Sequence, residues 1–102
     1  MSATGREGAS SLQQSDGRWL PAGIVTMDTA ATLLAASVAL PLPNSGIVDL
    51  TRVGRIDSAG VALMLAWKRR AGVERKPLAF SGVPESVTSL AMLYGVGDLL
   101  AA

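Results

Sequence analysis

The first part of the chain has the pattern of a strand hairpin. Short runs of mixed polar and apolar residues stand on either side of Asp16-Gly17, a dipeptide typical of tight hairpin turns. This pattern predicts two antiparallel strands within residues 12–25. Pro21 lies inside the second strand, and because proline cannot donate to a strand ladder we expect an edge position or a break there.

The next segment predicts a helix followed by a buried strand. Apolar residues recur there at near-helical spacing: Leu33, Leu34, Val38 and Leu40. Thr26 or Asp28 is the candidate cap of this helix, which cannot continue past Pro41. A turn at residues 44–46 then leads into residues 47–53, which are apolar and β-branched enough to form one central strand.

A second helix is predicted from about Ala59 to Ala71, with its end at Gly72. Three cations fall in the predicted last turn, where they would complement the helix dipole and stay solvated: Lys68, Arg69 and Arg70. The helix has apolar residues on more than one side, so either a thick core or another subunit must cover them. These residues are Val61, Leu63, Met64, Leu65 and Trp67.

The last part of the chain predicts a short strand and a final helix. The strand is expected at residues 77–80, and the helix opens at Pro84 and Glu85 and ends at Gly95. One face of that helix is apolar: Val87, Leu90, Ala91 and Tyr94. The order of elements predicts one small α/β domain, with a mixed sheet of about four strands and right-handed crossover helices. We expect a disordered tail at residues 1–11 and the folded domain at residues 12–102.

Composition removes several classes of function. The chain of 102 residues has a formal net charge of +1, so no overall electrostatic field recruits nucleic acid. It has no histidine and no cysteine, so the commonest general base, the thiol nucleophile and the usual metal ligands are missing. We therefore expect no catalytic residue, no metal and no cofactor.

The chain is also expected to stay out of the membrane. Its first residues lack the apolar core of a secretory signal, and the apolar-leaning run at residues 30–42 is shorter than the roughly 20 residues that a spanning helix needs. These features predict a soluble, cytoplasmic protein without direct membrane insertion.

The start of the second helix is the candidate functional site. Ser58 precedes the helix, and serine is a preferred cap, so a purely structural role is one interpretation. The other is a contact surface, because a helix start with free N–H groups and small side chains can receive an anion or a partner's side chain. The candidate partner-binding residues are Asp57, Ser58, Ala59, Gly60, Ala62 and Ala66.

At these residues the chain resembles the STAS family, the sulfate transporter and anti-sigma-factor antagonist domains. The family signature is an apolar strand with an aspartate, then Ser or Thr and a small-Gly step that opens a helix. Here it corresponds to Val48-Asp49-Leu50 and Asp57-Ser58-Ala59-Gly60. Residues 48–63 and 87–96 resemble in particular the STAS subunits of Mla-type phospholipid transporters. The chain departs from the family at residues 23–26, where a Gly-Glu-Leu-Asp-like turn is common.

The resemblance implies a non-enzymatic subunit that binds the ATPase of an Mla-type ABC transporter. Such a subunit supports the assembly and activity of the transporter in outer-membrane lipid asymmetry, and it lies peripheral to the inner membrane through the complex. The contact would be at Ser58 and the small residues after it.

Three other functions compete with this one. An anti-sigma-factor antagonist would bind an anti-sigma kinase and be switched by phosphorylation of Ser58. A phosphoryl-accepting receiver at Asp57 would need further carboxylates for Mg²⁺. A hydrolase with Ser58 as nucleophile would need a histidine and a Gly-x-Ser-x-Gly elbow, which the chain lacks.

Overall fold

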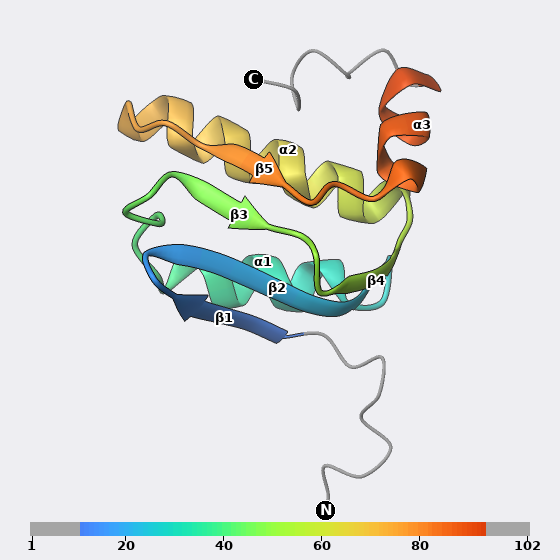
Figure 1. The fold of residues 1–102 in the computed structure, drawn as a ribbon, viewed down its shortest axis with the longest axis horizontal. Helices are drawn as coiled ribbons and strands as arrows, with labels where there is room; N and C mark the ends of the chain where they lie inside the picture. The colour runs from blue at the N-terminus through green and yellow to red at the C-terminus, as the bar shows by residue number, and fades with distance from the viewer. Residues whose placement is uncertain (1–10, 94–102) are drawn as a thin grey trace, which may run out of the picture.

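Five strands and three helices make up residues 11–93, the part of the chain that the computed structural model describes (Figure 1). In chain order they are β1 (Ser11–Ser15), β2 (Arg18–Val25), α1 (Ala30–Val38), β3 (Ile47–Asp49), β4 (Val53–Ile56), α2 (Ser58–Glu74), β5 (Ala79–Ser81) and α3 (Glu85–Leu93). Ser11 belongs to β1, while the rest of the predicted tail, and Tyr94 and Gly95, lie outside the described residues.

The sheet is mixed, as predicted. β1 runs antiparallel to β2, and β3, β4 and β5 all pair in parallel. The hairpin prediction is confirmed, because Asp16 and Gly17 join β1 to β2 with φ angles of 53° and 73°. Two consecutive positive φ angles match the right-handed twist of the flanking strands. The architecture is therefore the expected small α/β domain.

Of the two alternatives for Pro21, the edge position is wrong, and the break occurs in the parallel pairing along one side of β2 while the strand itself is continuous. β2 lies inside the sheet, with β1 on one side and both β3 and β4 on the other. β2 pairs with β3 at Arg18 and Trp19 and with β4 from Gly23 onward. Pro21 lies between these two stretches, where the strand changes its parallel partner and its missing N–H is tolerated.

The prediction of a single strand at residues 47–53 was also wrong. The carboxylate of Asp49 accepts hydrogen bonds from the backbone N–H of Thr51 at 2.9 Å and from its hydroxyl at 2.7 Å. An aspartate that bonds two residues ahead bends the chain into a turn. β3 therefore stops at Asp49, and β4 begins at Val53 beside the far end of β2.

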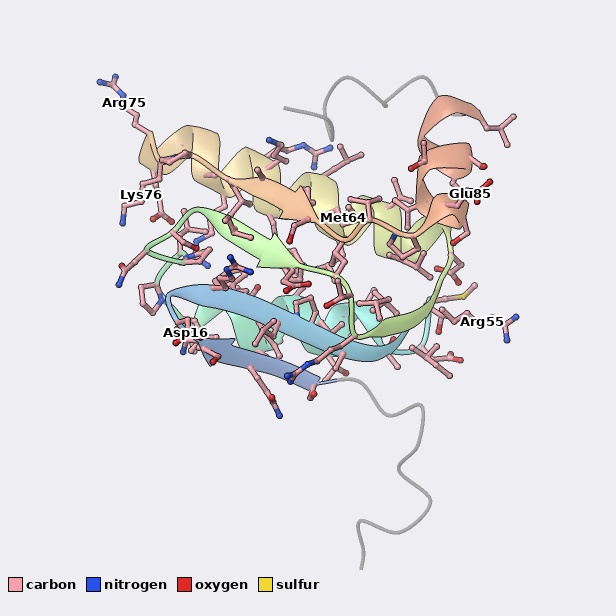
Figure 2. All side chains as sticks on the ribbon, viewed as in Figure 1. Asp16, Arg55, Met64, Arg75, Lys76 and Glu85 are labelled. Carbon is pink, nitrogen blue, oxygen red and sulfur yellow. The ribbon has the colours of Figure 1, made fainter. Side chains whose placement is uncertain are left out.

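Helices α1 and α2 lie on the same face of the sheet, and α3 stands beside the start of α2 (Figure 1). The side chain of Met64 lies between α2 and the strands (Figure 2) and is 1% exposed. Trp19 of β2 packs edge to face against Trp67 of α2, with 5.4 Å between the ring centroids. Val61, Leu63, Met64 and Trp67 are all buried within the chain, so the thick-core alternative holds for them. None of the helices in residues 11–93 is both long and apolar enough to cross a membrane.

Helix α2 extends past the predicted end at Gly72 to Glu74, with Arg75 in the left-handed conformation as its C-cap. The prediction that all three cations stay solvated was wrong for two of them. Lys68 donates to the carbonyl of Leu78 at 2.6 Å. Arg70 donates to the carbonyls of Ser37 and Leu40, as part of the contact between α2 and α1.

Helix α1 also differs from its prediction at the start. Its N-cap is Thr29, whose hydroxyl donates to the carbonyl of Ile24 at 2.7 Å and accepts from the N–H of Thr26 at 3.0 Å. Neither Thr26 nor Asp28 caps the helix. The hydroxyl of Thr29 thus fixes the chain where it leaves β2. β5 and the start of α3 follow their predicted positions within two residues, while the predicted end of α3 at Gly95 lies outside the described residues.

Gly60→Ala is expected to destabilise the fold, because α2 approaches the sheet there too closely for a side chain. A Cβ at Gly60 would lie 2.9 Å from the carbonyl oxygen of Val25 and would overlap the side chain of Ile56. Overpacking of this kind lowers the free energy of unfolding by about 1–3 kcal/mol. Urea unfolding of the variant and the parent chain measures this loss in the free energy of unfolding.

Gly72→Ala in the same helix is the matched control. A Cβ at Gly72 meets no atom within 4 Å, so this variant should gain about 0.5–1 kcal/mol from helix propensity. Equal unfolding midpoints for the two variants would contradict the close approach at Gly60.

Thr51→Val is expected to raise the pKa of Asp49. The hydrogen bonds from the hydroxyl and the N–H of Thr51 lower this pKa below its ordinary value of 3.8, and the charge of Arg18 adds to the effect. Because the pKa is lowered in the folded state, the ionised carboxylate of Asp49 stabilises the fold at pH values above its ordinary pKa. This contribution is lost as the pH falls through the lowered pKa. Carboxyl-carbon NMR titration should give a higher Asp49 pKa in the variant than in the parent, and no change for Thr32→Val on α1.

Candidate functional site

The start of α2 is built around the carboxylate of Asp57. One of its oxygens accepts the N–H of Ala59 at 2.8 Å and of Gly60 at 3.3 Å. The other accepts the N–H of Met27 at 3.2 Å, in the loop that leads to α1. Asp57 thus caps α2 and also ties the beginnings of the two helices together.

The structure corrects the role predicted for Ser58. Asp57 is the N-cap and Ser58 is the first residue of the helix. Ser58 is exposed, and within the described residues its hydroxyl makes no hydrogen bond. The predicted anion-receiving role of the helix start is not supported, because the Asp57 carboxylate already occupies the N–H groups of Ala59 and Gly60.

A shallow apolar groove of about 210 Å³ lies between α1 and α2. Small and aliphatic side chains from both helices line it: Ala30, Ala31, Leu34, Ala59, Ala62, Leu63 and Ala66. Three of the six predicted contact residues, Ala59, Ala62 and Ala66, therefore form one wall of a real groove. Their small size keeps the groove open.

The other predicted contact residues lie in different surroundings. Ser58 is exposed at the end of the groove where α2 begins, and Asp57 is half-buried in its capping bonds. Gly60 is buried against Ile56 and Val25, so its small size serves packing inside the chain. Gly60 is therefore not part of the accessible surface.

Sequence reasoning missed the contribution of α1. Leu34 and Val38 fit the helical spacing of core residues, yet they are 39% and 71% exposed. On α2, Arg69 and Val73 follow Ala62 and Ala66 on the same exposed stripe at helical spacing. The signal available in the sequence was the width of the apolar arc on α1, which exceeds what one side of a short helix can bury.

We call the resulting surface the two-helix face. It has an apolar centre, a hydroxyl at one end and a guanidinium toward the other. Its members are Ala31, Leu34 and Val38 of α1 and Ser58, Ala62, Ala66, Arg69 and Val73 of α2. Such a surface is suited to contact with another macromolecule.

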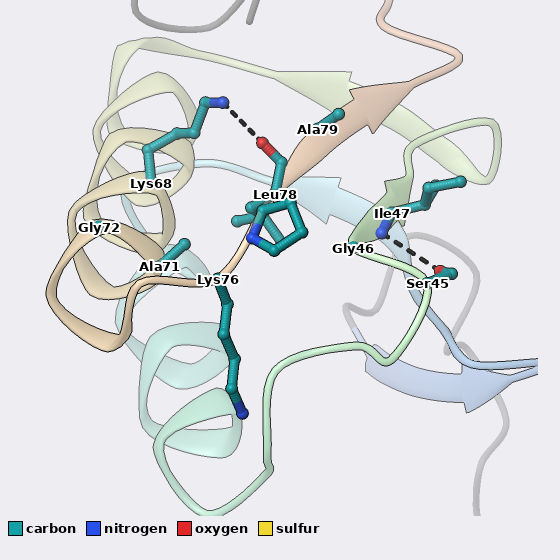
Figure 3. A pocket seen from close by; sticks show the side chains of 10 residues that line it. Ser45, Gly46, Ile47, Lys68, Ala71, Gly72, Lys76, Leu78 and Ala79 are labelled. Atoms are coloured by element: carbon teal, nitrogen blue, oxygen red, sulfur yellow. Dashed lines mark hydrogen bonds between the residues drawn. The ribbon is translucent and has the colours of Figure 1, made fainter.

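A second hollow, of about 460 Å³, lies where α2 meets β3 and the start of β5 (Figure 3). Its two lysines do not converge on one point. Lys68 donates to the carbonyl of Leu78, and Lys76 extends in the opposite direction (Figure 3). Residues 11–93 also contain no group of three acidic side chains that could hold a metal ion.

A comparison with known families identifies the domain. A family model described as "Mlab, STAS domain" matches residues 22–101. The chain belongs to the STAS domain family. A comparison with curated proteins gave no match. STAS domains are generally regulatory or interaction domains without catalytic activity.

Asp57→Ala is expected to destabilise this STAS domain by about 0.5–2 kcal/mol, since it removes a helix cap. It also removes the bond to Met27 that joins the two helix starts. Ser58→Ala is the neighbouring control and should change the free energy of unfolding by less than about 0.5 kcal/mol, because the hydroxyl is exposed. Chemical denaturation of both variants decides which residue is the cap. A larger loss for Ser58→Ala would reverse the assignment.

Proposed function

We propose that this STAS domain is an MlaB-type subunit that binds the ATPase of an Mla-type ABC transporter through its two-helix face. In this role it supports the assembly and activity of the transporter in phospholipid transport and outer-membrane lipid asymmetry. It carries out no chemistry itself. Its location is cytoplasmic and peripheral to the inner membrane, through the complex.

The observation that carries the proposal is the open apolar groove at the Ser58 end of α2. Leu34 and Val38 supply apolar area, while Ala62 and Ala66 let a partner helix approach closely. Burial of apolar area contributes roughly 25 cal/mol per Å² to such a contact. The resemblance to Mla-type subunits, together with the family match, supports the choice of partner.

A rigid platform supports the same role. The bond from the Met27 N–H to Asp57 holds one end of the helix pair, and the bonds from Arg70 to Ser37 and Leu40 hold the other. Because these bonds fix the groove before binding, the domain itself loses less conformational entropy when the complex forms. We infer that the domain acts by holding a segment of the ATPase in place.

The second candidate function is an anti-sigma-factor antagonist switched by phosphorylation of Ser58. The exposure of the hydroxyl favours it. Against it, a phosphate on Ser58 would stand beside the carboxylate of Asp57, which already holds the N–H groups of the helix start. Negative charges on two consecutive residues repel, which opposes the phosphorylated form. Mass spectrometry of Ser58 from cells, with a pull-down for a kinase, separates the two functions.

Ala62→Arg is expected to weaken binding of the ATPase at least about tenfold, or about 1.4 kcal/mol, because a long charged side chain would fill the groove. Ser58→Glu should weaken it as well, by placing a charge at the rim. Ala36→Arg is the matched control, since Ala36 is exposed on α1 about half a turn away from the groove. Isothermal titration calorimetry with the purified ATPase measures the affinities. Unchanged binding by Ala62→Arg and Ser58→Glu would show that the face is wrong.

A further inference from the structure

The two-helix face carries one formal charge, on Arg69. This residue is exposed and lies on α2 between Ala66 and Val73. The two ion pairs found in residues 11–93 are Arg18 with Asp49 and Arg70 with Glu74, so neither involves Arg69. Among the described residues, its guanidinium therefore has no acidic partner.

The neighbouring cation differs in this respect. Arg70 donates to Glu74 at 2.7 Å and to the carbonyls of Ser37 and Leu40 at 2.8 and 2.6 Å. These bonds occupy its guanidinium within the fold. Arg69, one residue earlier, points to the exposed stripe that also contains Ala62 and Val73.

A partner that covered this face would remove Arg69 from water. A buried guanidinium without an acceptor is costly, and arginine forms strong two-point hydrogen bonds with a carboxylate. An apolar partner surface would leave this charge uncompensated, whereas one with a suitably placed Asp or Glu would satisfy it. Charge complementarity thus selects the chemistry of the occupant.

We propose that the two-helix face binds an amphipathic helix of the ATPase that presents an apolar ridge to the groove and an acidic side chain to Arg69. The ridge lies along Ala59, Ala62 and Ala66, and the acidic residue lies about one helical turn beyond them, toward Val73. This inference rests on the proposed function and specifies the partner segment of the same face.

A second copy of the chain fits this face less well. No member of the two-helix face is acidic, so an identical face cannot offer Arg69 a carboxylate from within itself. The carboxylate of Asp57, just outside the face, already accepts three backbone N–H groups.

The test measures the affinity of the full chain for the purified ATPase at low and high salt. Arg69→Glu should weaken binding at least about tenfold at low ionic strength. Arg69→Gln should weaken it less and should also flatten the salt dependence between about 50 and about 500 mM NaCl, because the screened ion pair is gone. Arg52→Gln is the control, since Arg52 lies in the turn between β3 and β4 and contacts Gln13 of β1.

A rescue experiment identifies the acidic residue. Acidic residues of the ATPase are replaced one at a time by lysine, and each ATPase variant is tested with the parent chain and with Arg69→Glu. One of these ATPase variants should bind the parent chain weakly and should bind Arg69→Glu more tightly than the unchanged ATPase does. If no lysine substitution in the ATPase restores binding, and Arg69→Gln keeps the affinity and salt dependence of the parent chain, no acidic side chain of the ATPase pairs with Arg69 and the inference is overturned.

The outcomes for Ala62→Arg separate the two proposals. If Ala62→Arg abolishes binding while both Arg69 variants bind like the parent, the ATPase contact stands and its charge pairing is wrong. If Ala62→Arg and both Arg69 variants all bind like the parent, the contact itself is wrong. If sedimentation shows that the chain alone forms a dimer which Arg69→Glu dissociates, a second copy is the occupant and the inference is overturned.

Discussion

The guanidinium of Arg70 is the interaction on which the arrangement of the two helices depends. It donates to the carbonyls of Ser37 and Leu40, which stand at the end of α1 where helical partners run out. It also lies 5.8 Å from the ring centroid of Trp19, in cation–π range. The indole N–H of Trp67 donates to the buried hydroxyl of Ser37 at 2.9 Å. The spacing of α1 and α2, and with it the width of the groove, follows from these contacts.

Two small residues in the first turns of α2 face opposite surroundings. Gly60 faces inward, where the carbonyl of Val25 and the side chain of Ile56 leave no room for a Cβ. Ala62 faces outward, where it lines the groove. The two small residues therefore have different effects: Gly60 sets the distance from helix to sheet, and Ala62 keeps the groove open.

The sequence predicted the order of the elements except for β4, because hairpin, helix and strand signals are local. It missed features that depend on long-range contacts or on a competing local bond. The turn after Asp49 follows from its bonds to Thr51, which override the β-branched pattern of residues 47–53. The helix continues through Gly72 to Glu74, because Arg75 takes the left-handed conformation that ends it and donates its N–H to the carbonyls of Ala71 and Gly72. The positions of Lys68 and Arg70 depend on carbonyls distant in sequence. The small residues that α2 contributes to the groove were predicted from the sequence. The residues that α1 contributes could be identified only from the packing of the two helices.

The distribution of charge along α2 connects the fold to recognition. Lys68, Arg69 and Arg70 are consecutive, so helical geometry turns them about 100° apart and gives each a different neighbour. Lys68 reaches the chain before β5, and Arg70 reaches the end of α1. The direction that remains for Arg69 is the exposed stripe beside the groove. A run of three cations that looks uniform in the sequence thus divides into two residues that bond to backbone carbonyls of other elements and one that is exposed. This division follows from the helical repeat and from where the acceptor carbonyls lie.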